Sequence, residues 1–342
     1  MRHMRHVNQL IQHCVLHRHS LEGLEASVQC GDSGPSRGQQ GWQKAATSAL
    51  GSVAIALSFF AAPGLADPFR NSSPRPIDPQ AEAAFEALFK QGDYVTAAEL
   101  LQTASEDEPL THGMRASIAY LNGDNGSLGT HAALTRAAAE RLLERDALRG
   151  NLYLASANFL EGAQVIEERG LAAATPSVLG KLQQVFTHLR RAEAEDPNDP
   201  ELNLLRGFMD LMLAVNLPFS NPNQAIARFQ ENAAPSYLVN RGLAIAYRDL
   251  DQQESALEAV EQALAETPNN PEMLYLKAQI LVRLGRQEES LPLFNQALEL
   301  REQLPVSIRR NLAWEGCRTT NRINRIPDEQ SRNQCRVVRR EA

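Results

Sequence analysis

The chain has 342 residues, of which 43% are hydrophobic and 22% charged, and its formal net charge at pH 7 is −7. These proportions are typical of folded globular proteins, so they exclude a chain that is disordered throughout. The length exceeds one ordinary domain of about 150 residues, which leaves two domains or one extended repeat array. The acidic balance argues against a nucleic-acid-binding protein, because such proteins usually carry a basic excess.

The N-terminal region contains the pattern of a secretory signal that starts unusually late. Residues 1–42 show no stable apolar periodicity, so we expect a disordered extension or a start codon assigned too early. Residues 43–66 carry Lys44 near their start, continue with the apolar stretch 45–62 and end with small residues at Gly64 and Ala66. A positive start, a short apolar core and small residues at −3 and −1 predict a signal peptide that is cleaved after Ala66.

A membrane-spanning anchor is the alternative for residues 45–62. A spanning helix needs about 20 predominantly apolar residues, and this stretch is interrupted by serine, threonine and glycine. The signal interpretation predicts an exported chain in the periplasm or an equivalent lumenal compartment. The anchor interpretation predicts association with a membrane.

The chain beyond the signal is expected to be all-α. Residues 67–77 are rich in proline and predict an extended linker. Over 78–304 the apolar residues recur at helical spacing, with no sustained alternation and few β-branched runs. Glycine or proline separates the predicted helices.

Self-similarity at a fixed offset organises this all-α region. An offset of 34 residues aligns 237–270 with 271–304, and the two segments abut without a gap. A third copy covers 78–111, and a fourth, 200–236, carries a short insertion at Leu217 to Ser220. The aligned positions are Ala244, Tyr247, Leu250, Ala256, Val260, Ala263 and Leu264, followed by Ala278, Leu281, Leu284, Ser290, Phe294, Ala297 and Leu298.

The residue types at these positions suit paired helices. Small side chains such as Ala244 and Ala256 allow two antiparallel helices to approach closely, and Pro268 prevents the second helix from continuing. One such hairpin cannot bury its apolar face alone, so successive hairpins must stack. The sequence therefore predicts an alpha-solenoid of helix hairpins.

The period, the helix from Ala256 to Leu264 and the turn Gly92-x-Tyr94-x-x-Ala97 resemble the tetratricopeptide repeat family. Together with the signal, the resemblance indicates an exported bacterial member of that family.

The resemblance covers only part of the all-α region. It is partial for 176–236 and breaks down over 112–175, where we expect a long turn from Asn122 to Gly129 and irregular helices. Degenerate repeats and an inserted helical pair are both open explanations.

The resemblance implies a concave peptide-binding groove formed by the first helix of each hairpin. The positions that would contact a ligand are Leu238, Arg241, Ile245, Arg248 and Asp249, then Glu272, Tyr275, Gln279, Val282 and Arg283. The arginines with Tyr275 would suit an extended segment with acidic and apolar groups. The Lys/Asn pair that clamps a C-terminal carboxylate in some family members is replaced by Arg241 and Ile245. Alternatively, these residues only solubilise the inner face.

The sequence offers no pattern of catalytic or metal-binding residues. The three histidines after the signal, His112, His131 and His188, lie far apart and have no partner at ligand spacing. The sequence contains no motif of a nucleophile elbow, a phosphate-binding loop or a metalloprotease helix. We expect carboxylates such as Glu108 to lie on the solvated faces of helices. The sequence therefore predicts no metal, no cofactor and no enzyme. An enzyme would have to place its site in the irregular residues 112–175.

The C-terminal segment 305–342 is expected to form a basic cap. Residues 301–342 carry ten arginines and five acidic residues, whereas 67–300 have a net charge of −14. Export would leave Cys317 and Cys335 in an oxidising compartment, which predicts a disulfide, with two free thiols as the alternative.

These observations predict an exported, non-enzymatic scaffold that binds an unidentified protein or peptide, in envelope or membrane-complex assembly. Nucleic acid is not expected as a partner. A membrane-anchored adaptor remains open if residues 45–62 are not cleaved.

Overall fold

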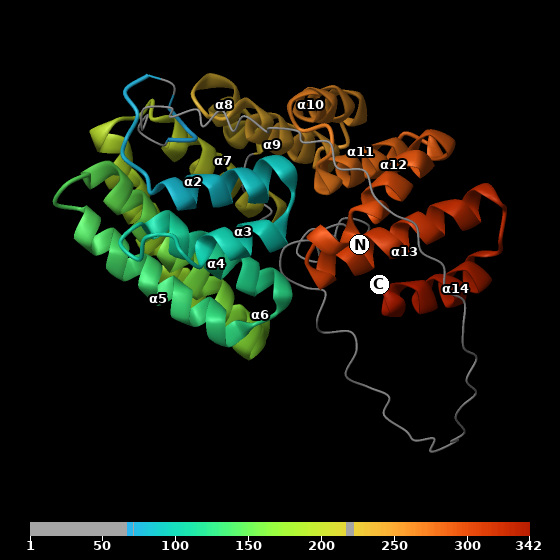
Figure 1. Ribbon diagram of the computed structural model, residues 1–342, viewed down its shortest axis with the longest axis horizontal. Helices are drawn as coiled ribbons and strands as arrows, with labels where there is room; N and C mark the ends of the chain where they lie inside the picture. Colours follow the sequence, from blue (N-terminus) through green and yellow to red (C-terminus); the bar gives the residue numbers. More distant parts are fainter. Residues whose placement is uncertain (1–66, 71, 217–221) are drawn as a thin grey trace, which may run out of the picture. The chain divides into compact units, whose positions relative to one another are not determined.

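The computed structural model describes residues 67–70, 72–216 and 222–342, and these residues are helical with no strand (Figure 1). The predicted extension 1–42, the signal 43–66 and the insertion at 217–220 lie outside the described residues. Within the described part of the chain, no helix has the length and apolar content needed to cross a membrane. The all-α prediction is confirmed.

The helices follow one another as packed pairs. The N-terminal pairs are α2 (Pro79–Phe85) with its π-helical continuation η1 (Glu86–Gln91) and α3 (Tyr94–Leu101), then α4 (Pro109–Asn122) and α5 (Asn125–Leu142). The long α6 (Ala147–Glu195) is followed by α7 (Pro200–Asn216) and α8 (Pro222–Glu231). The C-terminal pairs are α9 (Ser236–Asp249) and α10 (Gln253–Glu266), α11 (Pro271–Arg283) and α12 (Gln287–Glu299), and, after the 3₁₀ turn η2 (Arg301–Gln303), α13 (Val306–Ile323) and α14 (Asp328–Glu341).

Capping residues explain where several of these helices begin. Proline occupies the first turn of α2, α4 and α11, where its missing N–H costs no helical hydrogen bond. The side chain of Asp78 accepts from the backbone N–H groups of Gln80 and Ala81, and that of Asn270 accepts from the N–H group of Glu272. Local signals therefore mark the starts of α2, α4 and α11.

The irregular region contains additional helices rather than a long loop. The expected turn from Asn122 to Gly129 is wrong, because α5 begins at Asn125, capped by Asp124. Gly170 interrupts α6 with a φ of 73°, and the two halves of α6 pack against each other through Leu148, Leu152, Val185 and Leu189. Residues 147–195 thus supply another helix pair, at a spacing that does not follow the 34-residue period.

Small residues bring the helices of the C-terminal pairs together as expected. Ala244, Ala256 and Ala263 are fully buried. The ring of Phe229 fits against Gly242, where an added Cβ would lie 2.5 Å from the ring. These contacts belong to an apolar core that extends from Phe69 to Leu312.

The first hairpin also contacts the late repeats, far from its neighbours in sequence. The Asn270 side-chain amide donates to the carbonyl oxygens of Phe89, at 3.1 Å, and Lys90, at 3.3 Å. Further along, the Ser307 hydroxyl donates to the carbonyl oxygen of Leu121 at 2.8 Å. The repeat pattern does not predict these contacts, because nearest-neighbour stacking alone brings together only consecutive hairpins.

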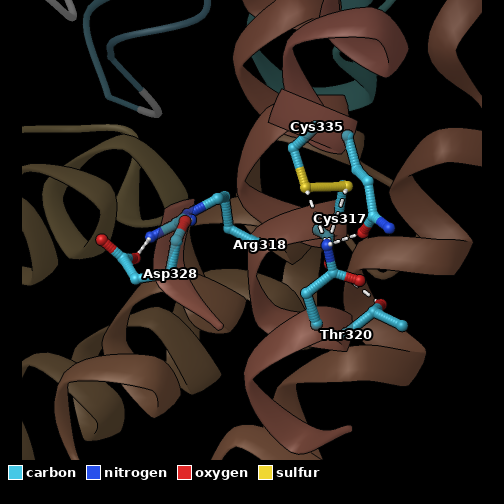
Figure 2. Close-up of a disulfide and its surroundings, with 8 residues drawn as sticks. Cys317, Arg318, Thr320, Asp328 and Cys335 are labelled. Atoms are coloured by element: carbon cyan, nitrogen blue, oxygen red, sulfur yellow. Dashed lines mark hydrogen bonds and ion pairs between the residues drawn. A yellow bond between two sulfur atoms is a disulfide. The ribbon is translucent and has the colours of Figure 1, made fainter. Parts of the chain in front are cut away.

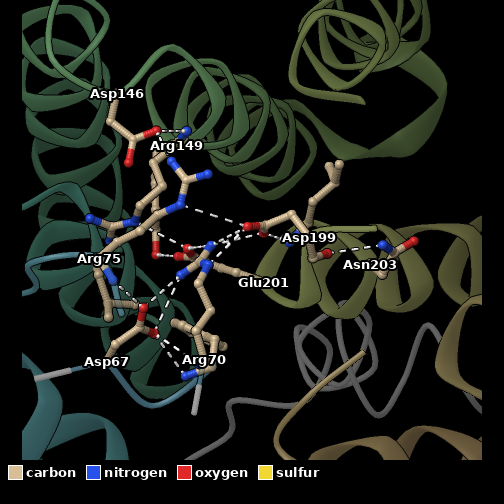
Figure 3. A network of polar contacts seen from close by, with 12 residues as sticks. Asp67, Arg70, Arg75, Asp146, Arg149, Asp199, Glu201 and Asn203 are labelled. Atoms are coloured by element: carbon tan, nitrogen blue, oxygen red, sulfur yellow. Dashed lines mark hydrogen bonds and ion pairs between the residues drawn. The ribbon is translucent and has the colours of Figure 1, made fainter. Parts of the chain in front are cut away.

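The segment 67–77 is irregular, but it is not a free linker. Phe69, Arg70 and Ile77 are buried. The Arg70 guanidinium donates to Asp199 at 2.7–2.8 Å and to Glu201 at 2.9 Å (Figure 3). Arg70 is held by a contact 129 residues away, which the proline content of the segment does not predict.

Arg70 belongs to a larger group of buried charges, which we call the buried ion cluster: Asp67, Arg70, Glu108, Arg149, Asp199 and Glu201. Arg149 reaches Glu108 at 2.9 Å and Glu201 at 3.1 Å, and the Tyr153 hydroxyl donates to Glu201 at 2.6 Å. The expectation that Glu108 lies on a solvated face is therefore wrong. Burial would raise the pKa of Glu201, but Arg149 and Arg70 outweigh it and hold that pKa below its usual value.

Candidate functional site

Three of the predicted groove residues, Arg248, Gln279 and Arg283, take part in polar contacts across α9, α11 and α13. On α9, the Arg248 guanidinium donates to the side-chain oxygen of Gln279 on α11 at 2.9 Å. Gln279 in turn donates to Glu315 on α13 at 2.9 Å. We call Arg248, Gln279, Arg283 and Glu315 the polar ladder, and it shows that the first helices of successive hairpins present these side chains to one another.

Several of the predicted groove residues are buried in the fold. Leu238 is 3% exposed and Tyr275 is 6% exposed. Burial and the neighbouring Glu315 carboxylate raise the pKa of Tyr275 well above its usual value. Ile245 and Val282 are partly buried and pack against the apolar core. In this conformation Leu238 and Tyr275 are structural residues of the repeats.

The first hairpin occupies the other end of the predicted groove. Arg241 pairs with Glu272 at 3.1 Å, and Glu272 also accepts from the Tyr94 hydroxyl at 3.1 Å. Next to this pair, Gly92 adopts a φ of 70°, and an added Cβ would lie 2.7 Å from Asn270. Arg241 is thus engaged with groups of its own chain.

Arg283 is the most accessible member of the ladder, with a side chain that is 39% exposed. Its guanidinium donates to the carbonyl oxygen of Arg248 at 2.9 Å. The carboxylate of Asp249 lies 4.0 Å away and already pairs with Arg248 at 3.0 Å. Burial and repulsion from Arg248 lower the pKa of Arg283, against the attraction of Asp249, Glu315 and Asp251.

A separate pocket of about 490 Å³ lies between α3, α4 and α5, within the region where an enzyme alternative would place its site. Its polar lining includes Arg115, Asp124, Ser127 and His131. The Ser127 hydroxyl donates to Asp124 at 2.6 Å, and Asp124 caps α5 through the N–H group of Ser127. Arg115 pairs with Glu106 at 2.8 Å. The serine and carboxylate therefore have a helix-capping arrangement, and we derive no reaction from it.

The structure brings two of the predicted isolated histidines together beside this pocket. His112 and His131 stack with ring centroids 5.9 Å apart. Burial is the main cause that lowers the pKa of both histidines, so both favour the neutral form. Among the described residues, no group of three or more histidine, cysteine or acidic side chains has an arrangement that would hold a metal ion.

The C-terminal segment forms a helix pair closed by the predicted disulfide. Cys317 of α13 and Cys335 of α14 are bonded, which confirms that prediction (Figure 2). Close by, Arg318 pairs with Asp328 at the start of α14. The basic cap is therefore an ordered hairpin that packs on α12 and extends the stack of helices.

Sequence reasoning named Arg248, Gln279 and Arg283 as groove positions but missed Glu315 and the buried ion cluster. The three residues were named because the resemblance to the repeat family implies ligand contacts at their positions. Apart from the neighbours Asp67 and Arg70, the ion pairs of the cluster join residues that are 41 to 131 apart and that no repeat relates. The one available signal was the pair Asp199 and Glu201 around the helix-starting Pro200, which is indistinguishable in sequence from a solvated helix cap.

Comparison with known families gives one match within the chain. Residues 241–305 match the model of the tetratricopeptide repeat, and this segment runs from α9 through η2. The resemblance inferred from the 34-residue period is confirmed there. No curated protein matches the chain.

Proposed function

Because residues 241–305 carry tetratricopeptide repeats, we propose that this protein is a non-enzymatic scaffold that binds a protein or peptide partner. Repeats of this kind generally mediate protein–protein interactions, and stacked hairpins provide an extended surface for them. The binding surface in our proposal is the accessible end of the polar ladder, around Arg283.

The exposed guanidinium of Arg283 is the observation that carries this choice. It lies 4.0 Å from the Asp249 carboxylate, which pairs with Arg248 at 3.0 Å. A carboxylate from a partner would form charge-assisted hydrogen bonds with Arg283 and relieve the repulsion between the two arginines. We therefore expect the partner to present an acidic side chain or a C-terminal carboxylate, next to apolar groups that contact Val282.

We further propose that the scaffold is exported and acts in envelope or membrane-complex assembly. The signal pattern before Asp67 supports export, and the Cys317–Cys335 disulfide is typical of oxidising compartments. If residues 45–62 are retained as an anchor, the same surface would act at a membrane.

The test compares two charge reversals on the full chain. Partners are captured from the native compartment with the wild type, with Arg283→Glu and with Arg286→Glu. Arg286 is the matched control, because it is exposed, near in sequence and already paired with Glu289. We expect Arg283→Glu to lose the partner, about tenfold or more in affinity, and Arg286→Glu to retain it. Equal retention by both variants contradicts the proposed surface.

A further inference from the structure

Three arginines line a small pocket between the last two helices, α13 and α14. Arg318 and Arg322 lie one turn apart on α13, and Arg325 follows in the turn that leads to α14. The space that they enclose with Asp328 and Ser331 has a volume of about 230 Å³. Because positions i and i+4 of a helix share one face, the spacing from Arg318 to Arg322 brings both side chains to the same pocket.

Arg318, the least exposed of the three arginines, is held in place by its neighbours. Its guanidinium donates to the carbonyl oxygen of Asp328 at 3.1 Å and pairs with the carboxylate of the same residue (Figure 2). It also lies 5.7 Å from the ring centroid of Trp314, which is a cation–π geometry. One positive group of the pocket is therefore positioned before any ligand binds.

The other two arginines have no carboxylate of their own. Arg322 and Arg325 are exposed, and within the described part of the chain neither forms an ion pair or a side-chain hydrogen bond. Among the described residues, Asp328 is the one acidic group that lines the pocket, and it already pairs with Arg318 and with Arg332. Three arginines and one aspartate leave the lining with a net charge of +2.

The backbone of Arg325 has a conformation that strains any residue with a side chain. Its φ is 54°, in the left-handed region. The turns that follow η1 and α4 have Gly92 and Gly123 at this conformation, each with a φ of 70°. An arginine in such a turn lowers the stability of the fold, and it adds the third positive charge to the pocket, so the strain points to a function.

We propose that this pocket is a binding site for a phosphate group, carried by a free anion or by the headgroup of a lipid. A phosphate monoester has a charge of about −1.5 to −2 at pH 7 and three acceptor oxygens. That charge matches the net +2 of the lining, and guanidinium groups bind phosphate oxygens through paired, charge-assisted hydrogen bonds.

The size of the pocket agrees with this ligand. One water takes about 30 Å³ in the liquid, so about 230 Å³ accommodates a phosphate group with a small substituent, but not an extended chain.

Asp328 acts as an internal competitor in this site. Its carboxylate pairs with the Arg318 guanidinium that a phosphate group would bind. The hydrogen bond from Arg318, together with the attraction of Arg332 and Arg322, holds the pKa of Asp328 below its usual value, so the competing charge is present at neutral pH. Removal of this one carboxylate should therefore strengthen phosphate binding.

The inference concerns α13 and α14 and does not depend on partner binding at Arg283. A failure here would leave the proposed scaffold surface intact, and the reverse is also true.

The experiment measures the binding of inorganic phosphate to the full chain by isothermal titration calorimetry at constant ionic strength. It compares the wild type with Arg322→Gln and Arg336→Gln. Arg336 is the matched control, because it is an exposed arginine of α14 that does not line the pocket. Both variants lose one positive charge. We expect Arg322→Gln to weaken phosphate binding about tenfold and Arg336→Gln to bind phosphate as the wild type does, because a guanidinium outside the pocket donates no hydrogen bond to the ligand.

Two further variants separate binding from folding. Arg325→Gly removes one charge of the pocket and also relieves the backbone strain, so it should bind phosphate more weakly while its stability in urea equals or exceeds that of the wild type. Asp328→Asn removes the competing carboxylate and should bind phosphate more tightly. A purely structural role of these residues predicts neither result.

Vesicles identify the source of the phosphate group. Co-sedimentation with phosphatidylcholine vesicles that requires added phosphatidic acid, and that Arg322→Gln abolishes, identifies a lipid headgroup. Binding of inorganic phosphate without such co-sedimentation identifies a soluble ligand.

Three outcomes would overturn the proposal. These are a wild type that binds neither probe, equal weakening by Arg322→Gln and Arg336→Gln, and unchanged phosphate binding in Arg325→Gly.

Discussion

Two regions of this molecule are held together by different means. The repeats from α9 to α12 pack through small and aromatic residues, such as Gly242 against Phe229, at positions that recur with the repeat period. The region where α4, α6 and α7 meet the segment 67–77 depends on the buried ion cluster, in which two arginines are enclosed by four carboxylates.

The two regions should differ in how well each tolerates the loss of a side chain. An apolar contact between neighbouring hairpins can lose one side chain and still bury the rest of its surface. A buried charge that loses its partner has no substitute, because desolvation remains while the attraction is gone. We therefore expect the irregular N-terminal region, and not the regular repeats, to be the more sensitive part of the fold.

The largest effect is expected for Arg149→Met. This change removes the cation that pairs with Glu108 and leaves Glu201 with Arg70 alone, so it should lower the free energy of unfolding by about 3–5 kcal/mol. Arg191→Met, on the exposed face of the same helix, should change it by less than about 0.5 kcal/mol. Urea denaturation of both variants measures their free energies of unfolding. Equal losses would show that the buried ion cluster contributes no more to stability than an exposed arginine.

A smaller and more local effect is expected for Cys335→Ser. The disulfide closes a loop of 18 residues, and its loss should cost up to about 3 kcal/mol in the chain-entropy model. Few residues of α14 are buried besides Ser331 and Cys335, so this helix should detach while α9 to α12 persist. Limited trypsin digestion should then cut the arginines of α14 first. Uniform digestion of the whole chain would instead show that the hairpin and the repeats unfold together.

The smallest of the three effects is expected for Gly242→Ala. The added methyl group would overlap the Phe229 ring, and overpacking of this kind costs about 1–3 kcal/mol. Gly180→Ala is the control, because an added Cβ meets no atom within 4 Å there, and alanine should slightly stabilise the helix. Thermal unfolding of Gly242→Ala and Gly180→Ala measures the change in stability of each variant. A loss at Gly242 as large as that of Arg149→Met would contradict the proposed difference in tolerance.

The two regions also differ in how well the sequence predicts them. Ala244, Ala256 and Ala263 could be recognised as buried helix contacts because each hairpin needs small residues where its two helices approach closely. The burial of Leu238 and Tyr275 was not predicted, because the family positions were expected to face a ligand, whereas the ring of Tyr275 lies 6.0 Å from that of Phe294 within its own hairpin. No periodicity encodes the contact between Asn270 and Phe89. That the predicted positions line a peptide-binding groove stays a prediction.

The contact between the first hairpin and the late repeats has a consequence for the order of folding. A stack of hairpins with only neighbouring contacts can fold progressively as it is synthesised. Here the carbonyl groups of Phe89 and Lys90 receive their hydrogen bonds from Asn270, and that of Leu121 from Ser307. Helices α2 to α4 therefore reach their final environment only after residues up to Ser307 have been synthesised. Until then part of their surface lacks its native contacts.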